Sequence, residues 1–177
     1  MRTEKGFSLI ELLIVVGIIL IIVAIAVPNL LRSKMAANES SAVASARTIG
    51  AANANYSTAF RQGFAGSLAQ LGPTSASCAT VSSACADLID SLLSGISQAS
   101  AIPVKSGYVF TYLAPNATPT AATSNNTFSV VATPVLPGSS GVSTFCLDQT
   151  NVIKKNATGA ATTGANTGCS AFSGTPI

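Results

Sequence analysis

Glu11 is the residue whose position most strongly suggests a chemical role, because it interrupts a long apolar run. From Phe7 to Val27 almost every other side chain is apolar, and Glu11 is the only charged residue between Phe7 and Leu31. A carboxylate inside a segment suited to hydrocarbon is costly, and such residues usually pair with another charge and serve a function. Glu11 is therefore a candidate site residue that needs a cation.

The rest of the sequence offers little for catalysis. It has no histidine and six acidic residues, so the commonest general base and the commonest metal ligand are missing. Asp87 and Asp90 are three positions apart on an expected helix, where a solvated face or an N-terminal cap explains them better than an acid pair. Lysine and arginine form no stripe with aromatic residues, so nucleic-acid binding is not indicated. We expect neither an enzyme nor a cofactor.

The four cysteines indicate disulfide bonds rather than a metal site. None lies in a CxxC pair, and zinc would need all four at unusual spacings. An even count beside a translocated N-terminal segment favours oxidation outside the cytoplasm. Of the three possible pairings we predict Cys78–Cys85 and Cys146–Cys169, because each closes a local, loop-like segment.

The apolar run itself has the length of a membrane span. At about 1.5 Å per residue, a helix from Phe7 to Val27 would cross a hydrocarbon core of roughly 30 Å. A cleaved secretory signal has a shorter apolar core followed by small residues, whereas this run ends in Val27-Pro28-Asn29. Positive charges lie on both sides of the apolar run, so charge alone does not give its orientation in the membrane. The expected disulfides place the C-terminal part outside the cytoplasm.

The residues around the start of the run resemble a known processing signal. Lys5-Gly6, Phe7, Ser8-Leu9-Ile10 and Glu11 follow one another and lead into unbroken apolar sequence up to Pro28. This order resembles the class III signal of type IV pilins and of the related pseudopilins of type II secretion systems. The resemblance covers roughly the first 35 residues. The chain departs from the family at one position: the glycine expected in the middle of the stem is replaced by Leu20, and Gly17 lies one turn earlier.

The resemblance implies a role for each matching position. Gly6 would be the last residue of a cytoplasmic leader, and a prepilin peptidase would cut between Gly6 and Phe7. Phe7 would become the new N-terminus and be N-methylated. Glu11 would be the acid that assembles the filament, and Pro28 matches a proline that kinks the stem helix of many pilins.

The chemistry of Glu11 supports an assembly role independently of the family resemblance. No lysine or arginine lies within the mature span, so the nearest cation would be the chain amine that cleavage creates at Phe7. A buried carboxylate needs such a partner once subunits leave the lipid. The amine of the same chain could serve, whereas the amine of a neighbouring chain would set the register between subunits.

The α+β fold class follows from periodicity and composition, and the resemblance adds a cytoplasmic leader and an assembly role for the stem. Together they predict five consecutive regions: a leader (1–6), a transmembrane and assembly half of a helical stem (7–28), an amphipathic half of that stem (29–62), a loop region with a short helix (63–106), and an antiparallel sheet with a disulfide-bounded C-terminal segment (107–177). In the amphipathic half, residues that recur at spacings of three, four or seven form one stripe along the helix: Leu31, Met35, Ala42, Ala46, Ile49, Asn53, Tyr56 and Phe60. The apolar face of the sheet is expected to pack against this stripe.

Turn residues and apolar runs predict the elements after the stem. Asp87 is expected to open the short helix. Strands are expected at 108–113, 127–132 and 143–147, with a shorter fourth at 152–154, and they are separated by clusters of Pro, Asn and Gly. Five N-x-[ST] triplets occur, which a sequence rich in Asn, Ser and Thr produces readily by chance; they begin at Asn38, Asn55, Asn116, Asn125 and Asn156.

The resemblance implies a structural subunit of a type IV pilus. Its partners would be further copies of itself, prepilin peptidase, an assembly ATPase, an inner-membrane platform and an outer-membrane secretin. The chain would sit in the inner membrane before assembly and at the cell surface afterwards. The alternatives are a pseudopilin of a type II secretion system and a monomeric membrane-anchored binding module. Asp148 is the only acid after Asp90, which argues against the calcium-binding major pseudopilin.

Overall fold

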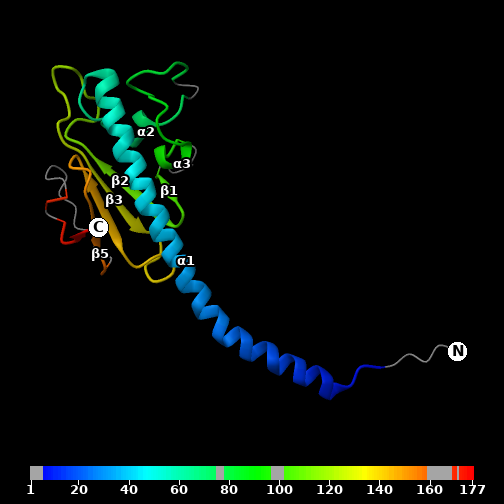
Figure 1. Ribbon diagram of the computed structural model, residues 1–177. Helices are drawn as coiled ribbons and strands as arrows, with labels where there is room; N and C mark the ends of the chain where they lie inside the picture. The colour runs from blue at the N-terminus through cyan, green and yellow to red at the C-terminus, as the bar shows by residue number, and fades with distance from the viewer. Residues whose placement is uncertain (1–5, 75–77, 97–101, 159–168, 171) are drawn as a thin grey trace. The chain divides into compact units, whose positions relative to one another are not determined.

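The computed structural model describes residues 6–74, 78–96, 102–158, 169–170 and 172–177. The chain divides into two compact units, residues 1–34 and residues 35–177. One long helix, α1 (Leu9–Phe60), contributes its first part to one unit and its second part to the other (Figure 1). The predicted leader, apart from Gly6, lies outside the described residues.

In the first unit, α1 is built from aliphatic residues and continues through Pro28. A proline inside a helix removes one backbone hydrogen bond. Next to it, two polar side chains bond to the helix itself. The amide of Asn29 donates to the carbonyl of Ile25 (3.1 Å), and the hydroxyl of Ser33 donates to the carbonyl of Asn29 (3.0 Å).

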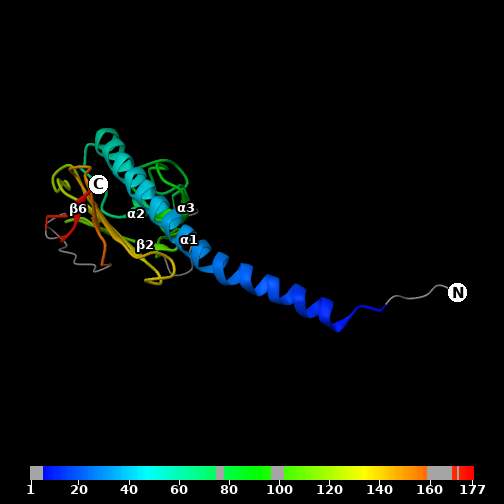
Figure 2. The same ribbon diagram turned by 60° about the horizontal axis from the view of Figure 1, so that its bottom comes forward.

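In the second unit, α1 lies against the sheet (Figure 2), and one stripe of its side chains is buried in the core that it shares with the sheet. The predicted stripe is confirmed from Ala42 onward, where buried residues recur at helical spacing: Ala42, Ala46, Ile49, Asn53 and Tyr56. Phe60 packs at its edge. Leu31, which the prediction included, is exposed and belongs to the first unit. Small alanine side chains let the helix approach the sheet closely.

The helix ends at a close backbone contact. Arg61 and Gly63 both adopt positive φ, 54° and 73° respectively. A side chain at Gly63 would place its Cβ 2.2 Å from the carbonyl oxygen of Asn125, so only glycine fits there. Beyond this turn lies α2 (Leu68–Leu71), a single helical turn that we did not predict because its two buried leucines are surrounded by turn residues.

The second predicted helix begins later than expected. Asp87 does not open it, because this residue has a positive φ of 54° and lies in the preceding loop. Helix α3 (Ser91–Ser94) is capped by Asp90, whose carboxylate accepts from the N–H groups of Leu92 and Leu93 at 3.0 Å each. The N-terminal cap that the sequence suggested for this acidic pair is thus made by Asp90.

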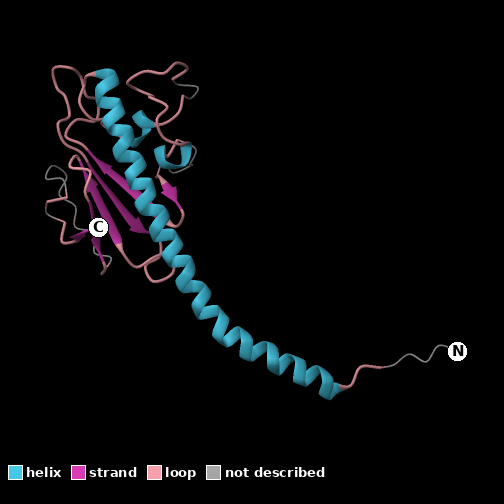
Figure 3. Cartoon of the chain, in the orientation of Figure 1, coloured by secondary structure: helices cyan, strands magenta, loops and turns pink. Residues whose placement is uncertain are grey.

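Among the described residues, six strands form one antiparallel sheet in chain order; the strands are magenta in Figure 3. Their bounds are β1 (Val104–Lys105), β2 (Tyr108–Leu113), β3 (Ser129–Pro134), β4 (Thr144–Asp148), β5 (Ile153–Asn156) and β6 (Thr175–Pro176). Each strand pairs antiparallel with its neighbours in sequence. The α+β class with a helix packed on a small antiparallel sheet is confirmed.

The sheet differs from its prediction mainly at strand ends. Strand β2 begins and ends as predicted, whereas β3 begins and ends two residues later, β4 one residue later at each end, and β5 reaches Asn156. Pro134 can close β3 because the pairing with β4 has already stopped at Ala132, so its missing N–H interrupts no ladder bond. Strands β1 and β6 were not predicted, since two residues leave no periodic signal.

The sheet is covered on both faces. The main core lies between the sheet and α1, with Tyr108, Phe110, Phe145 and Leu147 facing Ile49 and its neighbours. A second, smaller core on the opposite face contains Val131, Cys146, Cys169 and Phe172. The C-terminal segment therefore covers part of the face that α1 leaves open.

Candidate functional site

The first unit exposes an unusually large apolar surface. Every described residue from Gly6 to Lys34 is exposed in the single chain, including Phe7 and the aliphatic residues that follow it. By length and composition, α1 is apolar enough to cross a membrane. An uninterrupted exposed apolar surface of this kind needs lipid or other protein chains to cover it.

Glu11 lies in the first turn of α1 and is exposed. The partial positive charge at a helix N-terminus favours a carboxylate at this place. Among the described residues the side-chain ion pairs are Glu39–Lys155 and Asp90–Lys105, so Glu11 has no cationic partner within the described part of the chain. Its carboxylate is available to a partner from outside.

Gly6 is not required by the folded chain. A side chain placed on it would meet no atom within 4 Å, and its φ is not in the positive range. The same is true of Gly17. A small residue at position 6 therefore needs an explanation other than packing or backbone conformation.

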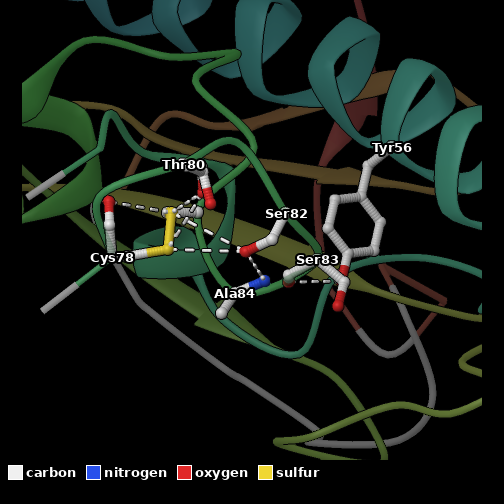
Figure 4. The surroundings of a disulfide bond; sticks show 7 residues. Tyr56, Cys78, Thr80, Ser82, Ser83 and Ala84 are labelled. Carbon is white, nitrogen blue, oxygen red and sulfur yellow. Dashed lines mark hydrogen bonds between the residues drawn. A yellow bond between two sulfur atoms is a disulfide. The ribbon is translucent and has the colours of Figure 1, made fainter.

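The Cys78–Cys85 disulfide closes a short loop beside α1 (Figure 4). Within the loop, the backbone groups of Ser82 and Cys85 form two reciprocal hydrogen bonds of 3.1 Å each. Tyr56 of α1 points to this loop and donates its hydroxyl to the carbonyl of Ser83 at 2.8 Å. Cys78 remains partly exposed. The loop is thus fixed to the helix by one side chain.

The second disulfide, Cys146–Cys169, is buried in the smaller core, with the two residues 2% and 1% exposed. Polar side chains hold the C-terminal segment at the same place. Asp148 accepts from the N–H of Cys169 at 3.0 Å, and Lys154 donates to its carbonyl at 2.8 Å. The segment is tied to β4 and β5 by one covalent bond and two hydrogen bonds.

The carboxylate of Asp148 is favoured in its charged form. Burial alone would raise the pKa of Asp148, but donation from the Thr150 hydroxyl and from the N–H of Cys169 outweighs burial and lowers it. Thr150 bonds to the same carboxylate through both its hydroxyl and its N–H. The turn after β4 is organised around this acid.

Glu39 joins distant parts of the second unit. One carboxylate oxygen accepts from the N–H groups of Val142 (3.1 Å) and Ser143 (3.0 Å), and the other lies 3.2 Å from Lys155 Nζ. Burial alone would raise the pKa of Glu39, but these donors lower it. Burial, and secondarily the charge of Glu39, raises the pKa of the Tyr108 hydroxyl. This role of Glu39 was not predicted, because one acid on an amphipathic helix is ordinary.

A buried polar network fixes the end of α1 to the sheet. The side-chain oxygen of Asn53 accepts from the Tyr112 hydroxyl (2.9 Å) and from the N–H of Ala65 (3.1 Å). The Tyr112 hydroxyl also lies 2.8 Å from the carbonyl of Ala65, and its pKa is raised, chiefly by burial. Asn125 is fully buried and bonds to the backbone of Phe64.

The five N-x-[ST] triplets differ in accessibility. Asn125 is 0% exposed and Asn156 is buried, so neither amide is open to modification in the folded chain. The amides of Asn38 and Asn116 are partly buried and donate to the carbonyls of Ser140 and Thr123. Asn55 is exposed on α1. In four of the five triplets the asparagine is thus buried or hydrogen-bonded within the fold.

No metal site is found among the described residues, since no three or more His, Cys, Asp or Glu side chains gather there. The features with a possible function are therefore the exposed apolar helix with Glu11, the small residue at Gly6, and surfaces of the second unit.

Comparison with known proteins places the N-terminal sequence. The model of the prokaryotic N-terminal methylation motif matches residues 1–27. Over 39 residues, 22% of this chain, the sequence is 56% identical to the type IV wide pilus major component PilA4 of Thermus thermophilus, and the match spans 30% of that relative's length. No solved structure matches the chain. The first part of the chain therefore carries the prokaryotic N-terminal methylation motif and is similar to a type IV pilus component, and the match spans less than a third of that relative.

Proposed function

We propose that this chain is the structural subunit of a type IV pilus filament and that it polymerises through the exposed first part of α1. The observation that carries the proposal is the continuous apolar surface of residues 7–31, interrupted by the single charge of Glu11. A membrane covers this surface before assembly, and the helices of other copies cover it in the filament.

Processing would precede assembly. Prepilin peptidase would cut between Gly6 and Phe7, and Phe7 would then be N-methylated, because the methylation motif covers these positions. The open space around Gly6 supports a requirement imposed by another protein rather than by the fold. The cut creates an amine at Phe7, four positions before Glu11 and two before the start of α1.

The carboxylate of Glu11, which has no cationic partner among the described residues, would guide assembly. Glu11 would pair with the amine of Phe7, of its own chain or of a neighbour, once lipid is removed from around the helix. An unpaired buried charge costs several kcal/mol, so burial of Glu11 among other helices would strongly favour its pairing with an amine. An assembly ATPase, an inner-membrane platform and an outer-membrane secretin would be the machinery.

A displayed pilus fits the second unit better than a pseudopilin. The C-terminal segment is tied to the outer face of the sheet by Cys146–Cys169 and covers it. Two disulfides suit a domain that works outside the cell. A monomeric anchored binding module would not explain why Glu11 occupies the apolar helix.

Shearing cells that express the chain tests the proposal. The sheared material is pelleted, viewed by electron microscopy, and digested for peptide identification. We expect fibres that contain this chain with an N-terminus at methylated Phe7. Recovery of the chain only in the membrane fraction, with no fibres, would point to an anchored monomer instead.

A further inference from the structure

Two basic residues, Arg32 and Lys34, lie where the apolar run of the first unit ends. Both are exposed, and neither has a hydrogen bond or an ion pair within the described part of the chain. Basic residues are more frequent on the cytoplasmic side of a membrane span, whereas disulfides formed outside the cytoplasm place these two on the outer side. Their presence there needs an explanation other than orientation.

Processing would leave these two charges without a counterpart at the other end of the run. Cleavage after Gly6 would remove Arg2 and Lys5, the two basic residues that precede the run. Arg32 and Lys34 would then be the only basic side chains next to the apolar run. The proposed polymerisation through the apolar surface does not use them.

The position of the two cations matches the thickness of a membrane. The twenty residues from Leu12 to Leu31 carry no charged side chain, belong to α1 and are all exposed. At about 1.5 Å per residue this stretch is about 30 Å long, which is roughly the thickness of the hydrocarbon core of a bilayer. When it spans the core, Glu11 lies at the inner boundary and Arg32 at the outer boundary. Neither charge then has to enter hydrocarbon.

Other polar groups near the outer end already have partners. The Asn29 amide and the Ser33 hydroxyl each donate to a carbonyl one turn earlier on α1, at 3.1 Å and 3.0 Å. Glu39, the next acid along the sequence, is bonded within the second unit. The charges of Arg32 and Lys34 are therefore available to a partner from outside the chain.

The phosphate of a lipid headgroup fits both the charge and the position. Guanidinium and ammonium groups form strong hydrogen bonds with phosphate, and their apolar stems can lie along hydrocarbon. The two residues are two positions apart, about 200° around the helix, so each can meet a separate headgroup. We propose that Arg32 and Lys34 bind the phosphates of anionic lipids in the non-cytoplasmic leaflet and hold the chain at a fixed depth before assembly. This inference rests on the membrane stage of the proposed function and names its lipid partner.

Anionic lipid is a better partner than zwitterionic lipid or free phosphate. No acid lies between Glu11 and Glu39 in the sequence, so the two positive charges are not compensated locally. One basic residue at an anionic membrane surface favours binding by about fivefold. A lipid also covers the exposed apolar helix next to the cations, which free phosphate cannot do.

Quenching of a single tryptophan by brominated lipids tests the preference. The chain has no tryptophan, and Leu30→Trp places one beside the cations at a side chain that is 68% exposed. The full chain is reconstituted in vesicles of anionic phosphatidylglycerol and zwitterionic phosphatidylcholine, with bromine on the acyl chains of one lipid at a time. We expect the quenching to show a preference for phosphatidylglycerol of about fivefold or more.

Charge variants show whether the two cations cause the preference. In the Leu30→Trp chain, Arg32→Gln combined with Lys34→Gln should remove it, whereas Arg32→Lys combined with Lys34→Arg should keep it. Arg47→Gln, at an exposed basic residue of the second unit, is the matched control and should also keep it. Equal quenching by the two lipids before the charges are changed would overturn the inference. An unchanged preference in the glutamine pair would overturn it too.

Three further outcomes identify other partners or an earlier failure. If inorganic phosphate removes the preference and sodium chloride of the same ionic strength does not, the cations bind free phosphate and the lipid assignment is wrong. If the glutamine pair loses its fibres although the unchanged cations show no lipid preference, their partner is an acidic protein and the lipid assignment is again wrong. If neither brominated lipid quenches the tryptophan, the chain is not inserted, and the membrane stage of the proposed function fails together with the inference.

Discussion

Glu39 and Lys155 form an ion pair of 3.2 Å between α1 and β5, across 116 positions of sequence. The same carboxylate accepts from the N–H groups of Val142 and Ser143 at the start of β4. One acid thus connects the helix, strand β5 and the loop between β3 and β4. The stability of this part of the unit should depend on its charge.

Acidification should weaken the connection at Glu39. Its folded pKa is lowered below the ordinary 4.5, because the donors from Ser143, Val142 and Lys155 outweigh burial. The stabilising contribution is therefore present above the unfolded pKa and is lost as pH falls through the folded pKa. Urea unfolding of the full chain in detergent, from about pH 6 to about pH 3, should show a smaller loss of stability for Glu39→Gln than for the native chain.

The Glu39→Gln variant isolates one contribution among several. Asp90 and Asp148 also have lowered pKa values, so the variant should keep part of the acid sensitivity. Lys155 is partly exposed, and the ion pair alone should contribute no more than about 1 kcal/mol. An unchanged pH dependence in Glu39→Gln would show that the carboxylate does not carry it.

Tyr112→Phe should cost about 0.5–1.5 kcal/mol of unfolding free energy. The change removes one hydroxyl from the Asn53 network, but the Asn53 oxygen keeps the N–H of Ala65 as a donor, so no buried acceptor is left without a partner. Thr111→Val, at the exposed neighbouring position of β2, is the matched control and should change stability by less than about 0.5 kcal/mol. Equal effects of the two variants would argue against the network.

The two disulfides should differ in their response to mild reduction. Cys78 is partly exposed, whereas Cys146 and Cys169 are almost fully buried. Stepwise reduction of the folded chain, followed by alkylation and peptide mass mapping, should therefore label Cys78 and Cys85 first. Earlier labelling of Cys146, or a peptide that joins Cys85 to Cys146, would contradict the structure.

Substitution of Gly6 by a bulky residue should block processing without affecting folding. No atom lies within 4 Å of a side chain placed there, so the folded chain can accept it. Intact-mass measurement of the membrane-bound chain should show an uncut, unmethylated precursor. Ala substituted at Gly17, where space is also open, is the control and should leave cleavage normal. Full cleavage of the Gly6 variant would count against the proposed processing site.

Glu11→Val should separate processing from assembly. The variant removes the one charge of the apolar run, so the chain should still be cleaved and inserted, but subunits would lack the pair that fixes their register. Membrane fractionation should recover a processed chain at normal level, while shearing should yield few fibres. A normal fibre yield from this variant would refute the role of Glu11.

Local sequence was enough to predict the long helix, its buried stripe from Ala42 onward and the bounds of β2. These elements repeat one pattern over many residues, so neighbouring positions reinforce one another. The predicted start of the second helix was wrong because Asp87 and Asp90 carry the same side chain. Only the backbone conformation of Asp87, with φ of 54°, distinguishes the two. Strands β1 and β6 were too short to leave a pattern.

The contacts of single polar residues could not be predicted. Glu39 bonds to residues more than 100 positions away, and Asn125 is buried against the end of α1 although its sequence reads as a surface triplet. Such contacts depend on how the loops close over the helix, which no local pattern encodes.

The most direct test of the filament is a reconstruction of sheared fibres by cryo-electron microscopy. The proposed function predicts that the first part of α1, from Leu9 to Leu31, is buried among identical helices in the fibre core, with Glu11 beside a chain amine and residues 35–177 outside. A fibre whose density does not fit this chain, or one in which this helix lies exposed on the surface, would contradict it.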